Sequence, residues 1–180
     1  MSVTYTTLLA GFGGQGILFT GKVMAYAGLV EGREVSWLPS YGPEMRGGTA
    51  NCSVTISDEP IGSPLIINPN IFVAMNLPSY DKFIDKVMPG GTVVIDSTLV
   101  GAKCERSDIK VFYVPATKLA DEGGFKGLAN MIILGKLLKE TGFAKYDSVM
   151  AGLKKSIPPR KANLIDANIK AIDTGMNFKD

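Results

Sequence analysis

The alternation of apolar and polar positions in the first sixty residues predicts a strand, a helix and two further strands. Residues 5–10 form an apolar run that stops at Gly11, and residues 15–30 carry apolar side chains at near-helical spacing. Residues 35–38 predict a second strand. Residues 50–56 alternate strictly between apolar and polar side chains. This period of two predicts a strand with one buried face and one polar face.

The short connection between the second and third strands indicates the type of sheet. Only about nine residues, 40–48, join them, whereas parallel neighbours need a crossover of roughly a dozen or more. If these strands pair, they therefore pair antiparallel. The sheet is expected to be mixed, which makes a purely parallel dinucleotide-binding sheet less favoured.

The second half of the chain predicts a βαβ unit followed by helices. Residues 71–75 are wholly apolar, a helix is expected over 78–87, and residues 92–96 form another apolar strand. The elements predicted after these are a strand at 111–114, a short helical piece, and helices over 128–141, 145–156 and 161–174. This order predicts an α/β fold.

Length and composition favour one globular domain over residues 1–180. The chain has 180 residues, of which 46% are hydrophobic and 20% are charged, so it can bury a core. Its net charge is only +2, which gives no indication of nucleic-acid binding. The start of the chain does not resemble a signal peptide. The apolar run at 131–134 is cut by Gly135 and Lys136 and is too short for a membrane span.

The sequence has no histidine and only two cysteines, which excludes several kinds of site. Catalytic triads and dyads that need histidine are excluded, as are zinc and iron sites with histidine ligands. Cys52 and Cys104 cannot supply the four thiolates of an iron–sulfur cluster. We therefore expect no metal in this chain. The low cysteine count fits a reducing cytoplasm.

Residues 11–16 match the pattern G-x-G-x-x-G between a predicted strand and a predicted helix. Such a turn can present backbone N–H groups to a phosphate, or its glycines can simply permit close packing. A dinucleotide site would also need an acidic residue at the end of the second strand. Glu31 and Glu34 precede that strand, so a nucleotide- or flavin-dependent reductase is the less favoured alternative.

Residues 40–48 hold Glu44, Arg46 and several glycines between two predicted strands. A loop at strand ends is a common place for a binding site, but a surface turn with two solvated charges has the same composition. Asn130, near the start of a predicted helix, fits either a phosphate contact or a cap. These residues alone leave the alternatives open.

Taken together, Gly-Phe-Gly-Gly-Gln-Gly at 11–16 and Ser-Tyr-Gly-Pro-Glu-Met-Arg-Gly-Gly at 40–48 resemble the gamma subunit of 2-oxoacid:ferredoxin oxidoreductases. The longer form of the second motif resembles the 2-oxoglutarate and branched-chain 2-oxoacid types more than the pyruvate type. The resemblance extends to 51–52, 58–64, 74–76, 89–91, Asn130, Asn168, Ala171 and Gly175.

The resemblance implies a three-layer α/β sandwich with a mixed, mostly parallel sheet, like domain III of pyruvate:ferredoxin oxidoreductase. It implies an enzyme complex that converts a 2-oxoacid and coenzyme A (CoA) into acyl-CoA, carbon dioxide and reduced ferredoxin. Thiamine diphosphate, magnesium and [4Fe-4S] clusters would reside in partner subunits, which are the thiamine-binding, alpha and ferredoxin-like chains. This chain would supply no catalytic residue but would help to bind CoA. A purely structural subunit is the other alternative. The residues carried over as CoA- or phosphate-binding are Gly11, Gly13, Gly14, Gln15, Gly16, Glu44, Arg46, Gly47, Gly48 and Asn130.

Overall fold

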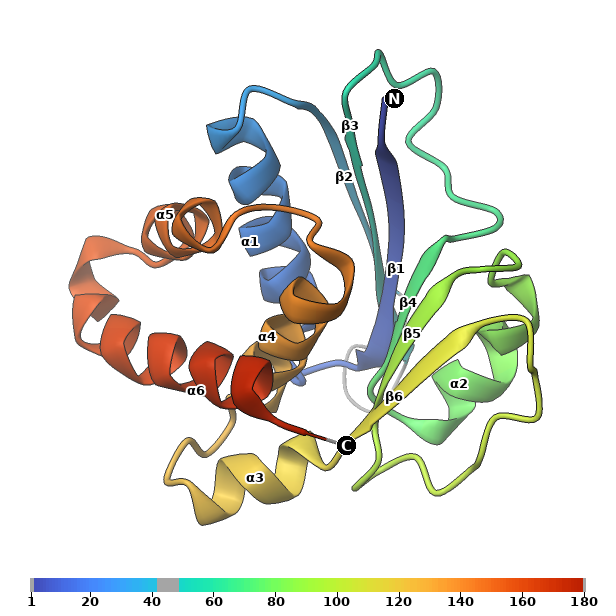
Figure 1. The fold of residues 1–180 in the computed structure, drawn as a ribbon. Coiled ribbons are helices and arrows are strands. Elements are labelled where there is room, and N and C mark those ends of the chain that lie inside the picture. The colour runs from blue at the N-terminus through green and yellow to red at the C-terminus, as the bar shows by residue number, and fades with distance from the viewer. Residues whose placement is uncertain (1, 42–48, 180) are drawn as a thin grey trace.

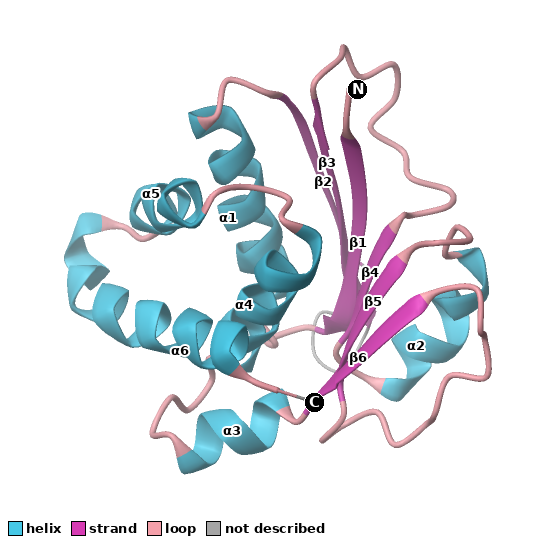
Figure 2. Cartoon of the chain, viewed as in Figure 1, coloured by secondary structure: helices cyan, strands magenta, loops and turns pink. Residues whose placement is uncertain are grey.

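The computed structural model describes residues 2–41 and 49–179, and its centre is a single six-stranded sheet (Figures 1 and 2). The strands lie in the order β2–β3–β1–β4–β5–β6. Their bounds are Thr4–Phe12 for β1, Glu34–Tyr41 for β2, Thr49–Ser57 for β3, Ile71–Ala74 for β4, Thr92–Asp96 for β5 and Lys110–Val114 for β6.

The sheet is mixed because β3 alone runs against the other strands. β3 pairs antiparallel with both β1 and β2, whereas β1, β4, β5 and β6 pair in parallel along the sheet. The antiparallel pairing of β2 with β3, predicted from the short connection, is confirmed.

Helices cover the sheet on two sides and complete three layers (Figure 1). One side carries α1, α4, α5 and α6, and the other carries α2. The predicted α/β sandwich with a mixed, mostly parallel sheet is confirmed. None of the helices in the two described ranges has the length and apolar character that crossing a membrane requires. The helix bounds are Ile17–Val30 for α1, Leu77–Phe83 for α2, Ala116–Glu122 for α3, Ala129–Thr141 for α4, Tyr146–Ser156 for α5 and Ile165–Asn177 for α6, with 3₁₀ turns η1 at Ile84–Lys86 and η2 at Pro159–Leu164.

Several predicted boundaries were wrong for local reasons. β1 continues to Phe12, beyond the predicted end at residue 10, because Phe12 still pairs with Thr49 of β3. The first helix begins after Gly16, whose φ of 76° lies in the left-handed region and is incompatible with a helix. The helix predicted over 78–87 is α2 followed by η1, and the last helix begins only after η2.

The central strands place alternate side chains in two separate apolar clusters. Leu9 of β1 and Val73 of β4 point into the cluster under α1 and α4, whereas Leu8 and Phe72 point into the cluster under α2. β3 contributes only to the first cluster, through Cys52 and its neighbours on that face. The second face of β3 therefore has no apolar core above it among the described residues.

Two glycines set the close contact between α4 and α6. A Cβ atom on Gly135 would overlap the carbonyl oxygen of Ile172, and one on Gly175 would overlap the carbonyl oxygen of Ile132. The two helix backbones therefore touch directly where they cross. Asn168 and Ala171 are buried on α6, the helix that also carries Gly175. All three residues belong to the resemblance described above.

An ion pair ties together segments far apart in the sequence at the amino-terminal end of β1. The Arg33 Nε atom donates to Asp58 at 2.8 Å, and its other two nitrogens donate to the carbonyl oxygens of Phe143 and Val3. The backbone N–H of Val3 donates to the second oxygen of Asp58 at 2.8 Å. This bond and the nearby Arg33 lower the pKa of Asp58 below its usual value.

The lowered pKa of Asp58 predicts acid-dependent stability. Because the folded state favours the charged carboxylate, Asp58 should stabilise the protein at neutral pH, and this contribution should be lost as pH falls below about 4, through the folded-state pKa. We expect Asp58→Asn to lower the thermal midpoint at pH 7, with a shrinking difference from the wild type toward pH 2–3. Thermal unfolding from pH 7 to pH 2 measures this, and a pH-independent difference would contradict it.

Candidate functional site

The carboxyl ends of β1 and β4 form the point where the sheet changes its direction of winding. These strands are parallel neighbours, with Ala10 beside Ala74. The chain leaves β1 into α1 on one face of the sheet and leaves β4 into α2 on the other (Figure 1). Open α/β sheets bind ligands at such a switch point. The predicted glycine turn lies at this position.

The glycine turn has an exposed tip and a constrained base. Phe12, Gly13 and Gly14 are exposed, and Gly14 has a φ of 94° with open space where a Cβ would lie. The turn ends at Gly16, the residue before α1. No side chain in the described ranges caps the start of α1, and its first turn contains no acidic residue. The free N–H groups and helix dipole there favour an anion.

Gln15 connects the glycine turn to the β4–α2 turn. Its Oε1 atom accepts from the backbone N–H of Phe12 at 2.6 Å, and its Nε2 atom donates to the carbonyl of Met75 at 2.9 Å. A Cβ on Gly11 would lie 2.5 Å from this Oε1. Gly11 and Gln15 therefore join the two turns that flank the switch point.

Asn130 holds the base of the same turn from α4. Its Nδ2 atom lies 3.3 Å from the Gly16 carbonyl oxygen and 3.2 Å from Thr20 Oγ1. A Cβ on Gly16 would overlap this amide. Asn130 is buried, and its Oδ1 atom has no hydrogen-bond partner among the residues that the structure describes. The structure thus brings together four of the predicted residues, Gly11, Gln15, Gly16 and Asn130, around one turn.

The second predicted motif falls largely outside the described residues. Glu44, Arg46, Gly47 and Gly48 lie in the range 42–48, for which the structure gives no description. The pairing of β1 with β3 shows where this range attaches: Thr49, which follows it, lies opposite Phe12. Both predicted motifs are therefore connected to the same edge of the sheet.

Two residues at this edge were not identified from the sequence as site residues. Asn76 is the N-cap residue of α2. Its Oδ1 atom accepts a hydrogen bond from the backbone N–H of Ser79 at 2.8 Å. The Nδ2 atom of Asn76 and the hydroxyl of Ser79 are buried, and neither has a hydrogen-bond partner within the ranges 2–41 and 49–179. Unpaired buried donors are costly, so they mark this edge as a place where a polar group from elsewhere would be stabilising. An Asn two residues before a Pro, directly after an apolar strand, was the available sequence signal.

The acidic and cysteine side chains near this edge have structural roles. Asp96, at the carboxyl end of β5, is fully buried and accepts from the hydroxyl of Thr117 at 2.6 Å and from two backbone N–H groups. Burial raises the pKa of Cys52 to about 12, so its thiol stays protonated. Cys104 packs on the other face of the sheet. Residues 2–41 and 49–179 include no group of three His, Cys, Asp or Glu that could hold a metal.

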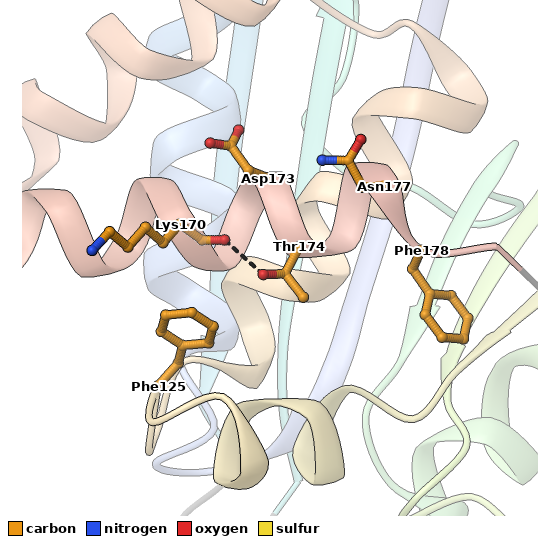
Figure 3. A pocket seen from close by; sticks show the side chains of 6 residues that line it. All are labelled: Phe125, Lys170, Asp173, Thr174, Asn177 and Phe178. Atoms are coloured by element: carbon orange, nitrogen blue, oxygen red, sulfur yellow. Dashed lines mark hydrogen bonds between the residues drawn. The ribbon is translucent and has the colours of Figure 1, made fainter.

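A shallow hollow of about 500 Å³ lies along α6, away from the switch point (Figure 3). Its polar groups bond within the protein: the Thr174 hydroxyl donates to the Lys170 carbonyl, and Asp173 accepts from the hydroxyl of Tyr146, each at 2.8 Å. The charged side chains of Lys170 and Asp173 point in different directions in Figure 3. This hollow has no convergent set of polar groups.

The strand order opposes a dinucleotide site. In the doubly wound fold, the strand that follows the glycine turn and its helix lies beside the first strand and ends in a ribose-binding acidic residue. Here β3 separates β2 from β1. Glu34 begins β2 and Glu31 lies at the end of α1, at the opposite edge of the sheet from the glycine turn.

Gln15 gives a prediction about the turn itself. We expect Gln15→Ala to cost about 1–2 kcal/mol in unfolding free energy because it removes the bonds to Phe12 and Met75. For a chain of this size this lowers the thermal midpoint by about 2–8 °C. Thermal unfolding measures this, with the exposed Asn163→Ala as the matched control. Equal midpoints for the two variants would contradict a structural role of Gln15.

Comparison with known sequences identifies relatives across nearly the whole chain. A family model described as pyruvate ferredoxin/flavodoxin oxidoreductase matches residues 6–178. The chain is 40% identical over 172 residues to the ketoisovalerate oxidoreductase subunit VorA of Methanothermobacter thermautotrophicus, covering 94% of this chain and 35% of that protein. It is 37% identical over 153 residues to the 2-oxoglutarate synthase subunit KorC of Methanocaldococcus jannaschii, covering 83% and 82%. This chain thus spans about a third of the length of the VorA relative.

Solved structures have the same fold. The gamma subunit of a keto/oxoacid ferredoxin oxidoreductase from Geobacter sulfurreducens superposes with a TM-score of 0.80 at 26% identity, covering 95% of both chains. The 2-oxoglutarate:ferredoxin oxidoreductase from Magnetococcus marinus, solved with 2-oxoglutarate, CoA and succinyl-CoA, superposes with a TM-score of 0.86 at 24% identity, covering 96% of this chain and 30% of that one. The match over residues 6–178, together with these relatives, confirms the resemblance, and the chain belongs to the pyruvate ferredoxin/flavodoxin oxidoreductase family.

Proposed function

We propose that this chain, as a single domain over residues 1–180, is the gamma subunit of a 2-oxoacid:ferredoxin oxidoreductase. The complex would oxidise a 2-oxoacid in the presence of CoA to acyl-CoA and carbon dioxide and pass the electrons to ferredoxin. The observation that carries this proposal is the family match over residues 6–178. KorC relatives of similar length support 2-oxoglutarate as the 2-oxoacid, and ketoisovalerate is the competing substrate because VorA is comparably similar.

The proposed role of this chain is to bind CoA at the switch point. The exposed tip at Gly13 and Gly14 and the uncapped start of α1 would face the CoA diphosphate. Gly11, Gln15, Gly16 and Asn130 would hold the turn in position. The CoA in the Magnetococcus marinus enzyme supports this choice of ligand.

The motif in the range 42–48 would complete this CoA site. Arg46 would pair with phosphate oxygens, since a guanidinium can donate two parallel hydrogen bonds to them. Glu44, Gly47 and Gly48 would shape the loop around it. The attachment of this range opposite Phe12, at the same edge as the glycine turn, supports this assignment.

The redox and decarboxylation chemistry would belong to partner subunits. Two cysteines on opposite faces of the sheet cannot hold a [4Fe-4S] cluster. We therefore propose that thiamine diphosphate, magnesium and the clusters are bound by the thiamine-binding, alpha and ferredoxin-like subunits. Thiamine diphosphate supplies the carbanion stabilisation that decarboxylation needs. This chain would contribute binding and positioning.

Purification from the native cell tests the proposal. The chain should co-purify with thiamine-binding and cluster-containing subunits, and the complex should reduce ferredoxin when 2-oxoglutarate and CoA are present. The isolated chain should contain no stoichiometric iron, flavin or thiamine by elemental analysis and absorption spectroscopy, and should show no such activity. A flavin band in the isolated chain would instead support the stand-alone reductase. A complex with full activity after removal of this chain would indicate a purely structural subunit.

A further inference from the structure

In the part of the chain that the structure describes, no helix covers the second face of β2 and β3. α2 packs on β1 and β4, and its apolar cluster draws no residue from β2 or β3. The polar side of β3 carries Asn51 and Ser53, both only partly buried, whereas Thr55 and Ser57 farther along the same side are buried. Leu65, Ile66 and Ile67 of the segment 58–70 lie beside this part of the sheet.

A groove of about 440 Å³ lies on this open face. Its floor includes Asn51 and Ser53 of β3, together with Ser40 of β2. One wall is formed by the segment 58–70, where Leu65 is 69% exposed and Ile67 is 77% exposed. These are the two most exposed of the large hydrophobic side chains in the described ranges. Apolar side chains left beside a hollow favour coverage by another protein surface.

The other wall of the groove is basic. Lys82 of α2 and Lys86 of η1 line it, and among the described residues they are the only charged ones in the groove lining. Their ammonium groups lie 5.2 and 5.4 Å from the centre of the Phe83 ring, which keeps both at the same rim. Asp81 and Asp85 of the same helical segment do not line the groove. An adjoining hollow adds one acidic residue, Glu59.

The lining of the groove is mixed: Leu8, Leu38 and Phe83 add apolar surface to it, and its polar groups favour carboxylates. The hydroxyls of Ser40 and Ser53 and the amide of Asn51 can all donate hydrogen bonds to a carboxylate, as can the two ammonium groups. The opposite wall needs apolar contacts with Leu65 and Ile67. A partner surface that matches both walls of the groove must present carboxylates on one side and apolar groups on the other. Such a surface is acidic and amphipathic.

The width of the open face fits one helix. α2 packs on the neighbouring strands β1 and β4, and the open strands β2 and β3 form a second such pair, so each pair spans roughly two strand spacings of about 4.8 Å. An α-helix with its side chains is about 10 Å in diameter. One helix laid beside α2 would therefore cover the uncovered half of the sheet.

We propose that this open face docks an acidic, amphipathic helix from a partner subunit of the oxidoreductase complex. Its acidic side faces Lys82 and Lys86, and its apolar side faces Leu65 and Ile67. This inference rests on the proposed function, because that function supplies the partner subunits. It adds the face of the chain that they contact and the chemistry of the contact.

Zero-length carbodiimide crosslinking of the assembled complex identifies the occupant. The reagent joins lysines to carboxylates in direct contact, so Lys82 and Lys86 should form crosslinks to Asp or Glu residues of a different subunit, detected by mass spectrometry. Crosslinks to another copy of this chain would overturn the proposal in favour of self-association. Crosslinks from Lys154 or Lys161, on the helix-covered side, with none from Lys82 and Lys86 would also overturn it.

Charge reversal measures the contribution of the basic wall. Lys82→Glu combined with Lys86→Glu should reduce the amount of co-purified partner subunits about tenfold or more, while the isolated variant keeps its circular dichroism spectrum. Leu65→Ser with Ile67→Ser should also reduce it. The matched control is Lys154→Glu with Lys161→Glu, both exposed, which should leave co-purification unchanged.

The outcomes separate this inference from the proposed function. If the wild-type chain co-purifies with no thiamine-binding subunit, the proposed function fails. If the wild type co-purifies normally and the Lys82→Glu, Lys86→Glu variant does too, only the docking site fails. An equal loss in the Lys154→Glu, Lys161→Glu control would also overturn the assignment to this face.

Discussion

Replacing Gly175 with alanine is expected to lower the unfolding free energy by about 3 kcal/mol, equivalent to a fall of roughly 6–12 °C in the thermal midpoint. The new methyl group would overlap the carbonyl oxygen of Ile132, so α4 and α6 must move apart along their buried contact. Gly135→Ala should have a similar effect through Ile172. Thermal or denaturant unfolding of the purified variants measures both losses.

The direction of the change in stability tests whether the two helix backbones are in direct contact. In a helix free of close contacts, Gly→Ala stabilises by up to about 1 kcal/mol because alanine has the higher helix propensity. Gly101→Ala, where a Cβ would meet only open space, is the control and should change the midpoint little. The double variant Gly135→Ala, Gly175→Ala should lose less than the sum of the single losses, because the first already separates the helices. A raised midpoint for Gly175→Ala would disprove the backbone contact.

Arg46→Ala in the assembled complex is expected to raise the apparent KM for CoA about 10- to 100-fold. This corresponds to roughly 1.5–3 kcal/mol, the loss expected when a charge-assisted phosphate contact is removed. The first half-reaction, which depends on the 2-oxoacid, should stay nearly intact. Arg46→Lys should restore only part of the affinity, because an ammonium group lacks the planar guanidinium. Steady-state CoA titrations and single-turnover decarboxylation measure the two effects.

The competing expectation for Arg46 is a contact with Glu44 or with a partner subunit. In that case Arg46→Ala would loosen the complex and depress both half-reactions together. Subunit stoichiometry must therefore be verified for each variant, and Arg160→Ala, an exposed arginine beside α5 and α6, serves as the matched control. An unchanged KM for CoA in an intact complex would refute the proposed contact.

The fold could be predicted well where local pattern determines it. The strict alternation over 50–56 and the short connection before it were enough to predict an antiparallel strand within a mixed sheet, and both are confirmed. The strand order could not be predicted, because β1 lies between β3 and β4, which follow it much later in the chain.

The close packing of α4 could not be predicted either, because in the sequence Gly135 and Lys136 only interrupt an apolar run. Lys136 is buried because Glu140 and the rings of Phe112 and Phe178 surround its ammonium group.

The candidate site was only partly accessible from the sequence. The glycine pattern predicted a turn between a strand and a helix, and the structure has one at residues 13–16. The pattern could not distinguish the exposed tip at Gly13 and Gly14 from the constrained base at Gly16, because the base is set by Asn130, far away in the sequence. Asn76 was visible only as a helix cap, since its unpaired Nδ2 atom depends on burial that tertiary packing creates.

The central place of β1 has a consequence for how the protein is made. β1 leaves the ribosome before its two neighbours in the sheet, β3 and β4, which end only at Ser57 and Ala74. At a synthesis rate of about 5–20 residues per second, β1 waits roughly 3–12 s before β4 is complete. Until β3 is complete, the apolar segment TYTTLLAGF has no strand beside it, and its β4 side stays unpaired for the whole of that time. The nascent chain therefore passes through a stage in which its future central strand is open to aggregation and to chaperones.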